Sequence, residues 1–234
     1  MRIAEPAAGL PGWGVAPRLG VMTLVPPFLR PSFHPMMRLA ACLLLFWLSV
    51  LPMQTWAQTG EQAGEQAGAL ADAVEEIDAD VLFLRHALAP GFGDPASFRI
   101  DDCRTQRNLS QAGRDQSRRI GDYLRGEGLD IRVILSSRWC RCVETAAEMG
   151  MGPFTIHDGL NSFFDGHVDR GETLALLRRH LGRIAATPDG GITLMVTHQV
   201  VITGITGIAP ASGGFVAYNS RTGAAMRAGT PVKP

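Results

Sequence analysis

Three short apolar runs of the sequence each lead into side chains that can act on phosphate. The residues at the ends of these runs are Arg85-His86, Ser136-Ser137 with Arg138 and Arg141, and Thr197-His198. Arginine carries a planar guanidinium fork that matches phosphate oxygens two at a time. A neutral histidine can attack phosphorus and hold the phosphoryl group covalently, while arginines neutralise the charge on the transferred oxygens. Brought together, these side chains would suit phosphoryl transfer.

The apolar runs themselves predict strands of a parallel sheet. They span residues 81–84, 133–135 and 192–196, and each is a nearly unbroken series of apolar residues. Continuous runs of this length are typical of strands buried on both faces. In open α/β sheets, ligands bind beyond the carboxyl ends of the strands. We therefore expect the residues at the ends of the three runs to converge on one pocket.

Helical patterns separate the runs. Ser110 can cap a helix over about 110–124, a second helix should follow Ser137, and a third is expected over about 172–186. Strands that alternate with helices indicate a layered α/β fold with right-handed crossovers. The remaining expected elements are a short helix after His198 and two closing strands at 214–219 and 224–228.

The amino-terminal part of the chain has the pattern of an export signal. Residues 1–35 are rich in proline and glycine, and Met36-Met37-Arg38 then opens an apolar run over 39–53 that is followed by Thr55-Trp56-Ala57. A basic residue, an apolar stretch and a small residue fit a secretory signal over about 36–57. The run is shorter than the roughly 20 residues of a membrane-spanning helix. We expect cleavage after Ala57 and a periplasmic or secreted protein.

Two alternatives remain for this part of the chain. The signal could stay uncleaved and anchor the protein to the inner membrane, or a cytosolic tail could precede a single anchor helix. The next segment, 58–77, contains a repeated Gly-Glu-Gln-Ala and is predicted to be a solvated linker. The folded domain is then expected over 78–234.

Composition sets few limits on the partner. Apolar residues make up 46% of the chain, which is enough for a core, and 22 basic residues balance 22 acidic ones. A net charge of zero gives no reason to expect nucleic acid or an anionic membrane surface as a partner. An anionic small substrate is still possible, because a few local arginines can bind one.

The cysteines fit an oxidising compartment. Cys103, Cys140 and Cys142 lie beyond the predicted signal, so one pair should close and one thiol should stay free. Cys140 and Cys142 are two residues apart on a predicted helix and point to different sides. A bridge from Cys103 to one of them is therefore expected, and buried thiols are the alternative. A zinc site would need a fourth ligand that the spacing does not supply.

The three motifs, in this order and spacing, resemble the histidine phosphatase superfamily, the phosphoglycerate-mutase-like proteins, and in particular their small, exported bacterial branch. The resemblance covers about 80–218 and implies a three-layer α/β/α sandwich with a mostly parallel central sheet. It implies that His86 is the phosphorylated nucleophile, and that Arg85, Arg141 and His198 complete the phosphate pocket. Arg138 stands where the family more often has proline. The further residues expected at the substrate are Asn108, Ser137 and Gln199.

Two positions depart from the family pattern. Ala87 replaces the usual glycine after the nucleophile, and the segment 160–164 lacks the usual glutamate that donates a proton to the leaving group. The acid-phosphatase branch uses an aspartate after the second histidine, where this chain has Gln199. Asp165, Asp169 or Glu172 could supply the acid from a loop, although each is by default a solvated carboxylate. A phosphohistidine substrate would need the acid less.

The sequence therefore predicts an exported phosphatase that needs no metal or cofactor. Its substrate would be a phosphorylated small molecule or phosphoprotein, such as a phosphohistidine protein, a sugar phosphate or a phosphorylated envelope component. Contact with a membrane is expected only through an uncleaved signal. The main alternative is a non-catalytic phosphate-binding module of the same fold. A weaker one is a thiol-redox or metal protein built on the three cysteines.

Overall fold

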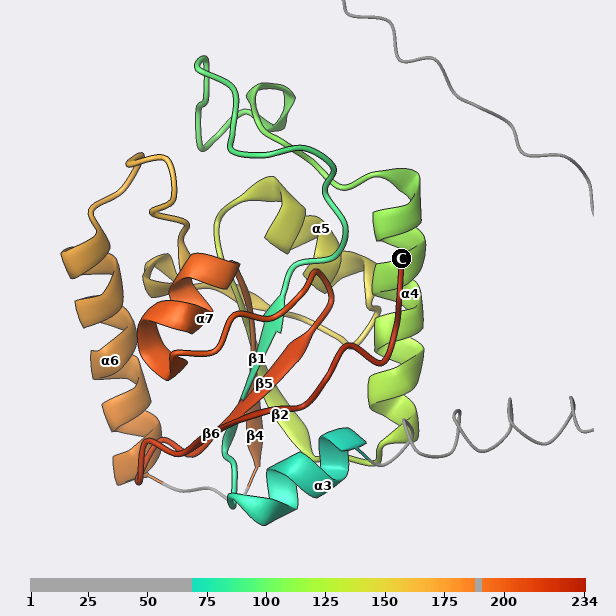
Figure 1. Ribbon diagram of the computed structural model, residues 1–234, viewed down its shortest axis with the longest axis vertical. Helices are drawn as coiled ribbons and strands as arrows, with labels where there is room; N and C mark the ends of the chain where they lie inside the picture. The colour runs from blue at the N-terminus through green and yellow to red at the C-terminus, as the bar shows by residue number, and fades with distance from the viewer. Residues whose placement is uncertain (1–68, 188–190) are drawn as a thin grey trace, which may run out of the picture. The chain divides into compact units, whose positions relative to one another are not determined.

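The computed structural model describes residues 69–187 and 191–234, which form a layered α/β domain (Figure 1). The predicted signal and the first part of the predicted linker lie outside the described residues. The described chain forms a six-stranded sheet in the order β3-β2-β4-β1-β5-β6. Its strands are β1 (Val81–Arg85), β2 (Ile131–Ser136), β3 (Thr155–Ile156), β4 (Ile192–Thr197), β5 (Phe215–Tyr218) and β6 (Ala225–Arg227).

The sheet is mostly parallel, as predicted. β3, β2, β4 and β1 run in one direction, and β5 and β6 close the sheet as antiparallel strands. The predicted closing strands at 214–219 and 224–228 are thus confirmed as β5 and β6. The crossovers between parallel strands are the helices that the apolar spacing predicted.

Helices cover both faces of the sheet (Figure 1). One face packs against α3 (Ala69–Glu76), α4 (Gln111–Gly126) and α5 (Cys140–Glu148), and the other against α6 (Arg170–Ala186) and α7 (Gln199–Thr206). Successive side chains of β1 point to opposite faces of the sheet, so Leu82 joins the first core cluster and Phe83 joins the second. The three-layer α/β/α prediction is confirmed. Two 3₁₀ turns, Cys103–Thr105 and Asp158–Leu160, lie in the connections.

The domain begins before residue 78, so the predicted linker boundary is wrong. α3 occupies residues that were assigned to the linker, and its Leu70 side chain is fully buried in the first core cluster. The Ala71 backbone N–H also donates to Glu127 at 3.1 Å. α3 is only eight residues long, too short to show a clear helical period after a low-complexity segment. It lies at the amino ends of the strands (Figure 1).

Two details of the sheet were not predicted. β3 has only two residues, so it pairs with β2 through Leu135 and Ser136 alone. The first half of β2 therefore has no neighbour on that side, and Val133 is 41% exposed. The prediction that this run is buried on both faces holds only for the second half of β2.

α4 is packed tightly on the loop that follows β1. The predicted cap is present, because the Ser110 hydroxyl accepts a hydrogen bond from the Gly113 N–H at 3.1 Å. A Cβ at Gly113 would overlap the Leu88 carbonyl oxygen, so only glycine allows this approach. The contact fixes the segment that carries His86.

Within residues 69–187 and 191–234, no helix combines the length and the apolarity needed to cross a membrane.

Candidate active site

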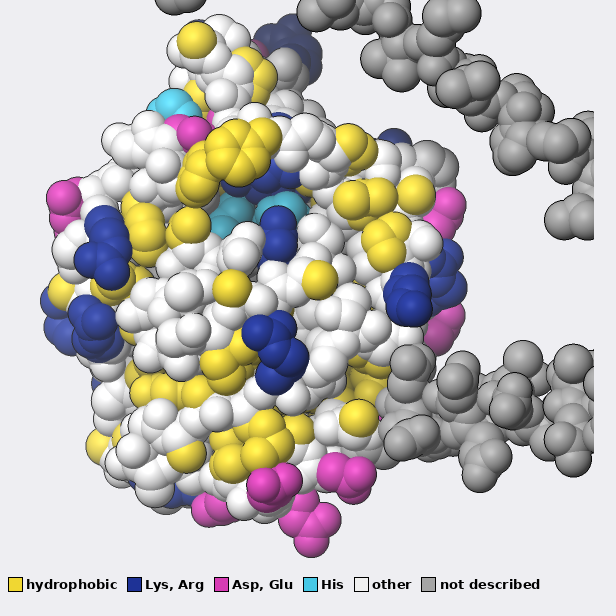
Figure 2. Space-filling model, viewed as in Figure 1, with side chains coloured by type: hydrophobic (Ala, Val, Ile, Leu, Met, Phe, Trp, Pro, Cys, Tyr) yellow, Lys and Arg dark blue, Asp and Glu magenta, His cyan; other side chains and the backbone are white. Residues whose placement is uncertain are grey.

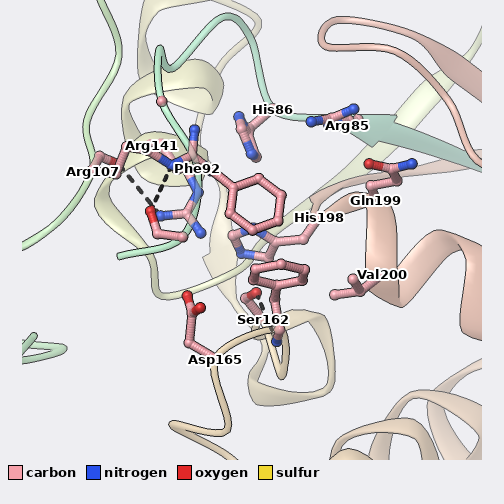
Figure 3. Close-up of a pocket in the computed structure, with 13 residues that line it drawn as sticks. Arg85, His86, Phe92, Arg107, Arg141, Ser162, Asp165, His198, Gln199 and Val200 are labelled. Carbon is pink, nitrogen blue, oxygen red and sulfur yellow. Dashed lines mark hydrogen bonds between the residues drawn. The ribbon is translucent and has the colours of Figure 1, made fainter. Parts of the chain in front are cut away.

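The three strand ends meet at one edge of the sheet, as predicted. Arg85 at the end of β1 is in register with Thr197 at the end of β4, and Val196 of β4 is in register with Ser136 of β2. The residues that follow therefore lie side by side. The rings of His86 and His198 are 5.4 Å apart between centroids and meet edge to face. Together with Arg85 and Arg141 they line a pocket of about 90 Å³ (Figure 3).

His86 is held as a neutral ring with one free nitrogen. Its Nδ1 lies 2.8 Å from the Ala87 carbonyl oxygen, and because a carbonyl only accepts, Nδ1 must carry the hydrogen. His86 is only 2% exposed. This burial, together with the positive charge of Arg141, lowers the pKa of His86 well below its ordinary value. The lone pair of Nε2 is consequently available at neutral pH.

His198 is also neutral but has polar support. Burial and Arg141 lower its pKa well below the usual value. Its Nε2 lies 3.0 Å from the Ser137 hydroxyl, which donates to the side-chain Oδ1 of Asn161 at 3.2 Å. Ser137 was predicted to touch the substrate. In the structure it is fully buried, does not line the pocket and contacts His198, so its contact with the substrate stays a prediction.

The predicted arginines enter the pocket with unused donors. Arg85 donates from Nη1 to the Pro210 carbonyl at 3.0 Å, and Arg141 donates from Nη1 to Asp94 at 2.8 Å. The Nε of each guanidinium is buried and has no partner among the described residues. A buried N–H without a partner is costly unless a ligand satisfies it. Both donors are therefore suited to an oxygen-rich anion.

Two residues of the site were missed by sequence reasoning. Arg107 lines the pocket and donates from Nε to the Gly93 carbonyl at 2.8 Å and from Nη1 to the Ala89 carbonyl. Asp94 is almost fully buried and accepts from Arg141, from Trp139 Nε1 at 3.0 Å and from the Arg107 N–H at 2.9 Å. Both lie in or next to the aperiodic loop after β1. The only signal in the sequence was the position of Arg107 beside the Asn108-Leu109-Ser110 motif.

Asp94 keeps its negative charge inside the protein. Burial alone would raise the pKa of Asp94, but the hydrogen bonds from Arg141 and from the Arg107 backbone outweigh it and hold this pKa below its usual value. The carboxylate thus stays ionised and fixes the guanidinium of Arg141. It also joins the loop after β1 to the start of α5.

A disulfide joins the same two segments. Cys103 and Cys140 are bonded, which settles the pairing that the sequence left open, and Cys142 is a buried free thiol. Cys140 precedes Arg141, and Cys103 lies four residues before Arg107. Burial raises the pKa of Cys142 to about 12, which makes it a poor nucleophile. The described residues contain no group of three potential metal ligands. Neither observation favours the thiol-redox or metal alternative.

Other predicted residues fall inside and outside the pocket. Gln199 and Asp165 line it. Asn108 does not, since its amide donates to the Cys103 carbonyl at 2.6 Å. Arg138 is half-exposed and pairs with Asp158, so the family position it occupies is not a phosphate contact here. Glu172 lies in the first turn of α6, where its N–H is capped by Asp169 at 2.7 Å, and neither carboxylate reaches the pocket wall.

The rim of the pocket is apolar. Phe92 and Phe164 line the opening, with exposures of 87% and 46%, and their rings meet edge to face at 4.8 Å. Gly91 and Gly93 have positive φ angles of 93° and 65°, which lets the chain reverse around Phe92. Figure 2 shows histidine and lysine-or-arginine side chains in a hollow bordered by hydrophobic ones. The pocket therefore has a cationic interior and an aromatic opening.

Fold and site together define an α/β protein with two neutral histidines and three arginines at one edge of its sheet. Residues 81–181 match the family model described as the histidine phosphatase superfamily, branch 1, so this stretch of the chain is similar to that superfamily. The match contains His86 and Arg141, whereas His198 lies beyond it. Among curated proteins, no relative matches the sequence.

Solved structures with a similar chain course include three phosphatases. A mycobacterial glucosyl-3-phosphoglycerate phosphatase is 13% identical with a TM-score of 0.46, covering 65% of this chain and 98% of its own. The protein histidine phosphatase SixA, in complex with tungstate, is 19% identical with a TM-score of 0.42, covering 63% and 92%. A putative alpha-ribazole-5'-P phosphatase from Escherichia coli is 15% identical with a TM-score of 0.46, covering 63% and 93%.

Proposed function

We propose that this domain is a phosphatase that transfers the phosphoryl group of its substrate to Nε2 of His86 and then to water. The observation that carries the proposal is the state of His86: a buried neutral ring whose Nδ1 hydrogen is committed to the Ala87 carbonyl. This bond fixes the tautomer and leaves the lone pair on Nε2, as nucleophilic attack requires. The substrate class is a phosphorylated small molecule or phosphoprotein, and no nucleic-acid partner is expected.

In the first step, the Nε2 lone pair forms a bond to phosphorus and the bond from phosphorus to the leaving group breaks. Arg85, Arg107 and Arg141 surround the position of the transferred oxygens and carry the positive charge that the transition state needs. His198, held by Ser137, is the proposed further contact of the phosphoryl group, because its ring meets that of His86 edge to face. Three guanidinium groups supply this charge without a metal ion, so the proposed mechanism is metal-independent.

Asp165 is the proposed proton donor. Of the three carboxylates suggested by the sequence, it alone lines the pocket, and it is tied to the loop after β1 because its Oδ2 accepts the Asp94 N–H at 3.0 Å. In its protonated form it would pass a proton to the departing oxygen or nitrogen. In the second step, water attacks phosphorus, the bond to Nε2 breaks, and the Asp165 carboxylate takes a proton from the water.

A non-catalytic phosphate-binding module is the second candidate function. The observation that favours it is the exposure of Asp165, since a general acid is usually held in a less solvated position. Such a module would keep the arginines and bind phosphate, but would not turn it over. The two candidate functions differ in one measurable property, which is the turnover of a phosphorylated substrate.

Hydrolysis of p-nitrophenyl phosphate by the purified protein, with EDTA present, tests the proposal. We expect chelator-resistant turnover that falls by about 10⁴-fold or more in His86→Ala, because the nucleophile is lost. The matched control is His180→Ala, on α6 and away from the pocket, with turnover within about twofold of the wild type. Phosphate binding without turnover on any phosphoester or phosphoramidate would support the second candidate. Activity abolished by EDTA would contradict the metal-independent mechanism.

We also propose that the protein is exported. The signal pattern over 36–57 supports this, and a disulfide between Cys103 and Cys140 suits an oxidising compartment such as the periplasm. An uncleaved signal that anchors the protein to the inner membrane is the alternative. Amino-terminal sequencing of the protein from its native cells should give Gln58 as the first residue if the signal is removed.

A further inference from the structure

The pocket has two chemically different parts. Its interior is lined by Arg85, His86, Arg107, Arg141 and His198, and we call this set the floor. The other side chains that line the pocket are the apolar Phe92, Phe164 and Val200 and the polar Ser162, Asp165 and Gln199, and we call this set the mouth. A phosphoester bound with its phosphate on the floor must place its leaving group in the mouth.

The mouth exposes apolar surface that the fold does not need. In the part of the chain that the structure describes, four large hydrophobic side chains are substantially exposed, and Phe92 and Phe164 are two of them. The two rings touch each other edge to face at 4.8 Å, across loops that are 72 residues apart in the sequence. Exposed aromatic surface beside a polar pocket is typical of a binding site. An unoccupied ring face can stack on a flat apolar group.

The charges of the pocket leave no cation for a second anionic group. The three arginines that line the pocket all belong to the floor. The mouth adds the hydroxyl of Ser162, the amide of Gln199 and the carboxyl group of Asp165. None of its side chains is a cation, so a second phosphate would meet no positive partner among the residues of the mouth.

The acid chemistry of the mouth points the same way. Asp165 is exposed and already accepts a hydrogen bond from the Asp94 N–H. An alkoxide leaving group needs a well-placed acid, whereas a phenolate, whose conjugate acid has a pKa of about 10, departs with much less help. Weak acid assistance and an aromatic surface are thus compatible with the same kind of substrate.

We propose that the mouth is a leaving-group subsite that selects aryl phosphates, or phosphoryl compounds with an equally flat apolar group next to the phosphate. This inference rests on the proposed function, because it assigns the leaving group of the same reaction. Phe92 and Phe164 are its specificity-determining residues. They act by binding the ring of the substrate, so their removal should affect KM for aryl substrates more than kcat.

The test compares phenylphosphonate with methylphosphonate, whose carbon–phosphorus bonds resist hydrolysis, by titration calorimetry on the full chain. We expect phenylphosphonate to bind about tenfold more tightly. In the double variant Phe92→Ser/Phe164→Ser, the ratio of the two affinities should fall to within about twofold. The matched control is Val133→Ser, which removes an exposed apolar side chain from the first half of β2 and should keep the wild-type ratio.

Turnover of phenyl phosphate and 2-naphthyl phosphate completes the test, since both are aryl esters and they differ mainly in apolar area. The wild type should prefer the naphthyl ester through KM, and the double variant should lose that preference. A phosphonate ratio near one in a wild type that hydrolyses phenyl phosphate overturns this inference and leaves the proposed function standing. The expected ratio in a protein that hydrolyses no phosphoester or phosphoramidate overturns the proposed function and leaves the aromatic subsite standing.

Discussion

The domain contains two histidine pairs of nearly equal geometry and very different chemistry. His86 and His198 meet edge to face at 5.4 Å, and His157 and His180 meet edge to face at 4.6 Å. Burial lowers the pKa in both pairs, to about 4 for His180, where His157 and Arg183 add to the effect. Contact between two neutral imidazoles therefore does not distinguish an active site from a structural cluster.

The hydrogen bonds of the rings make the difference. Nδ1 of His157 accepts the Gly159 N–H at 3.1 Å, and Nδ1 of His180 lies 3.0 Å from the guanidinium of Arg183, which can only donate. In both rings the remaining hydrogen must then sit on Nε2, and no lone pair is free. In His86 the partner is a carbonyl, so the lone pair stays on Nε2. The tautomer, fixed by one backbone group, separates the proposed nucleophile from two rings that have no free lone pair.

The two histidine pairs differ most in the carboxylates near them, Asp94 for the first pair and Asp158 for the second. Removing these carboxylates should give the largest difference in stability. Asp94→Ala leaves the buried Arg141 without its partner and should lower the free energy of unfolding by about 3–5 kcal/mol. Asp158→Ala, which removes the half-exposed partner of Arg138 beside His157, should cost about 1 kcal/mol or less. Urea denaturation of both variants gives the two values. Equal losses would show that the buried pair is not special.

The second effect concerns the disulfide Cys103–Cys140, which lies near the pair His86 and His198. Reduction of Cys103–Cys140 should destabilise the domain by about 2–4 kcal/mol and lower the phosphatase rate, because it frees the segments that hold Arg107 and Arg141. Melting temperature and turnover before and after dithiothreitol measure both. The NMR signals of the His157 and His180 rings should stay in place. Unchanged rate and stability after confirmed reduction would rule out a role in positioning the arginines.

The third effect is the pH dependence of stability. The folded-state pKa of His86 and of His198 lies below the unfolded value of about 6.5, so the unfolded chain takes up protons first as the pH falls. The free energy of unfolding should thus be highest above about pH 6.5. It should decrease as the pH drops further, by about 1.4 kcal/mol per pH unit for each ring. Denaturation at about pH 7, 6 and 5, with His198→Asn and His180→Asn, separates the contributions.

A ligand should distinguish the pairs in the same experiment. An anion in the pocket favours the charged form of His198, so inorganic phosphate should flatten the part of the slope that His198→Asn removes. The part that His180→Asn removes should not change, because that ring faces no pocket. A phosphate effect on both parts would mean that the two pairs are coupled.

The core of the site could be predicted from the sequence because it depends on local rules. Buried parallel strands bring their carboxyl ends to one edge, and that alone places Arg85, His86, Arg141 and His198 together. The residues that were missed depend on long-range contacts instead. Asp94 reaches Arg141 across 47 positions, from a loop without any period. Ser137 and Asn108 were placed at the substrate by their neighbours in the sequence, yet side-chain hydrogen bonds turn both away from the pocket.

Segment length explains the remaining errors in the fold. β3 has two residues and α3 has eight, and neither is long enough for a hydrophobic period to stand out. α3 is recognised through the burial of Leu70 and Ala73, which depends on strands that come later in the chain. The linker prediction was wrong there because the residues of α3 were assigned from the low-complexity composition of the residues before them.

The position of α3 decides how the domain can be attached to anything else. The helix leads into β1 at the amino ends of the strands (Figure 1). The pocket is lined by Arg85, His86 and His198, which lie at or directly after the carboxyl ends of β1 and β4. A tag or a fused domain joined directly to Ala69 would therefore enter the domain at the end of the sheet opposite the pocket.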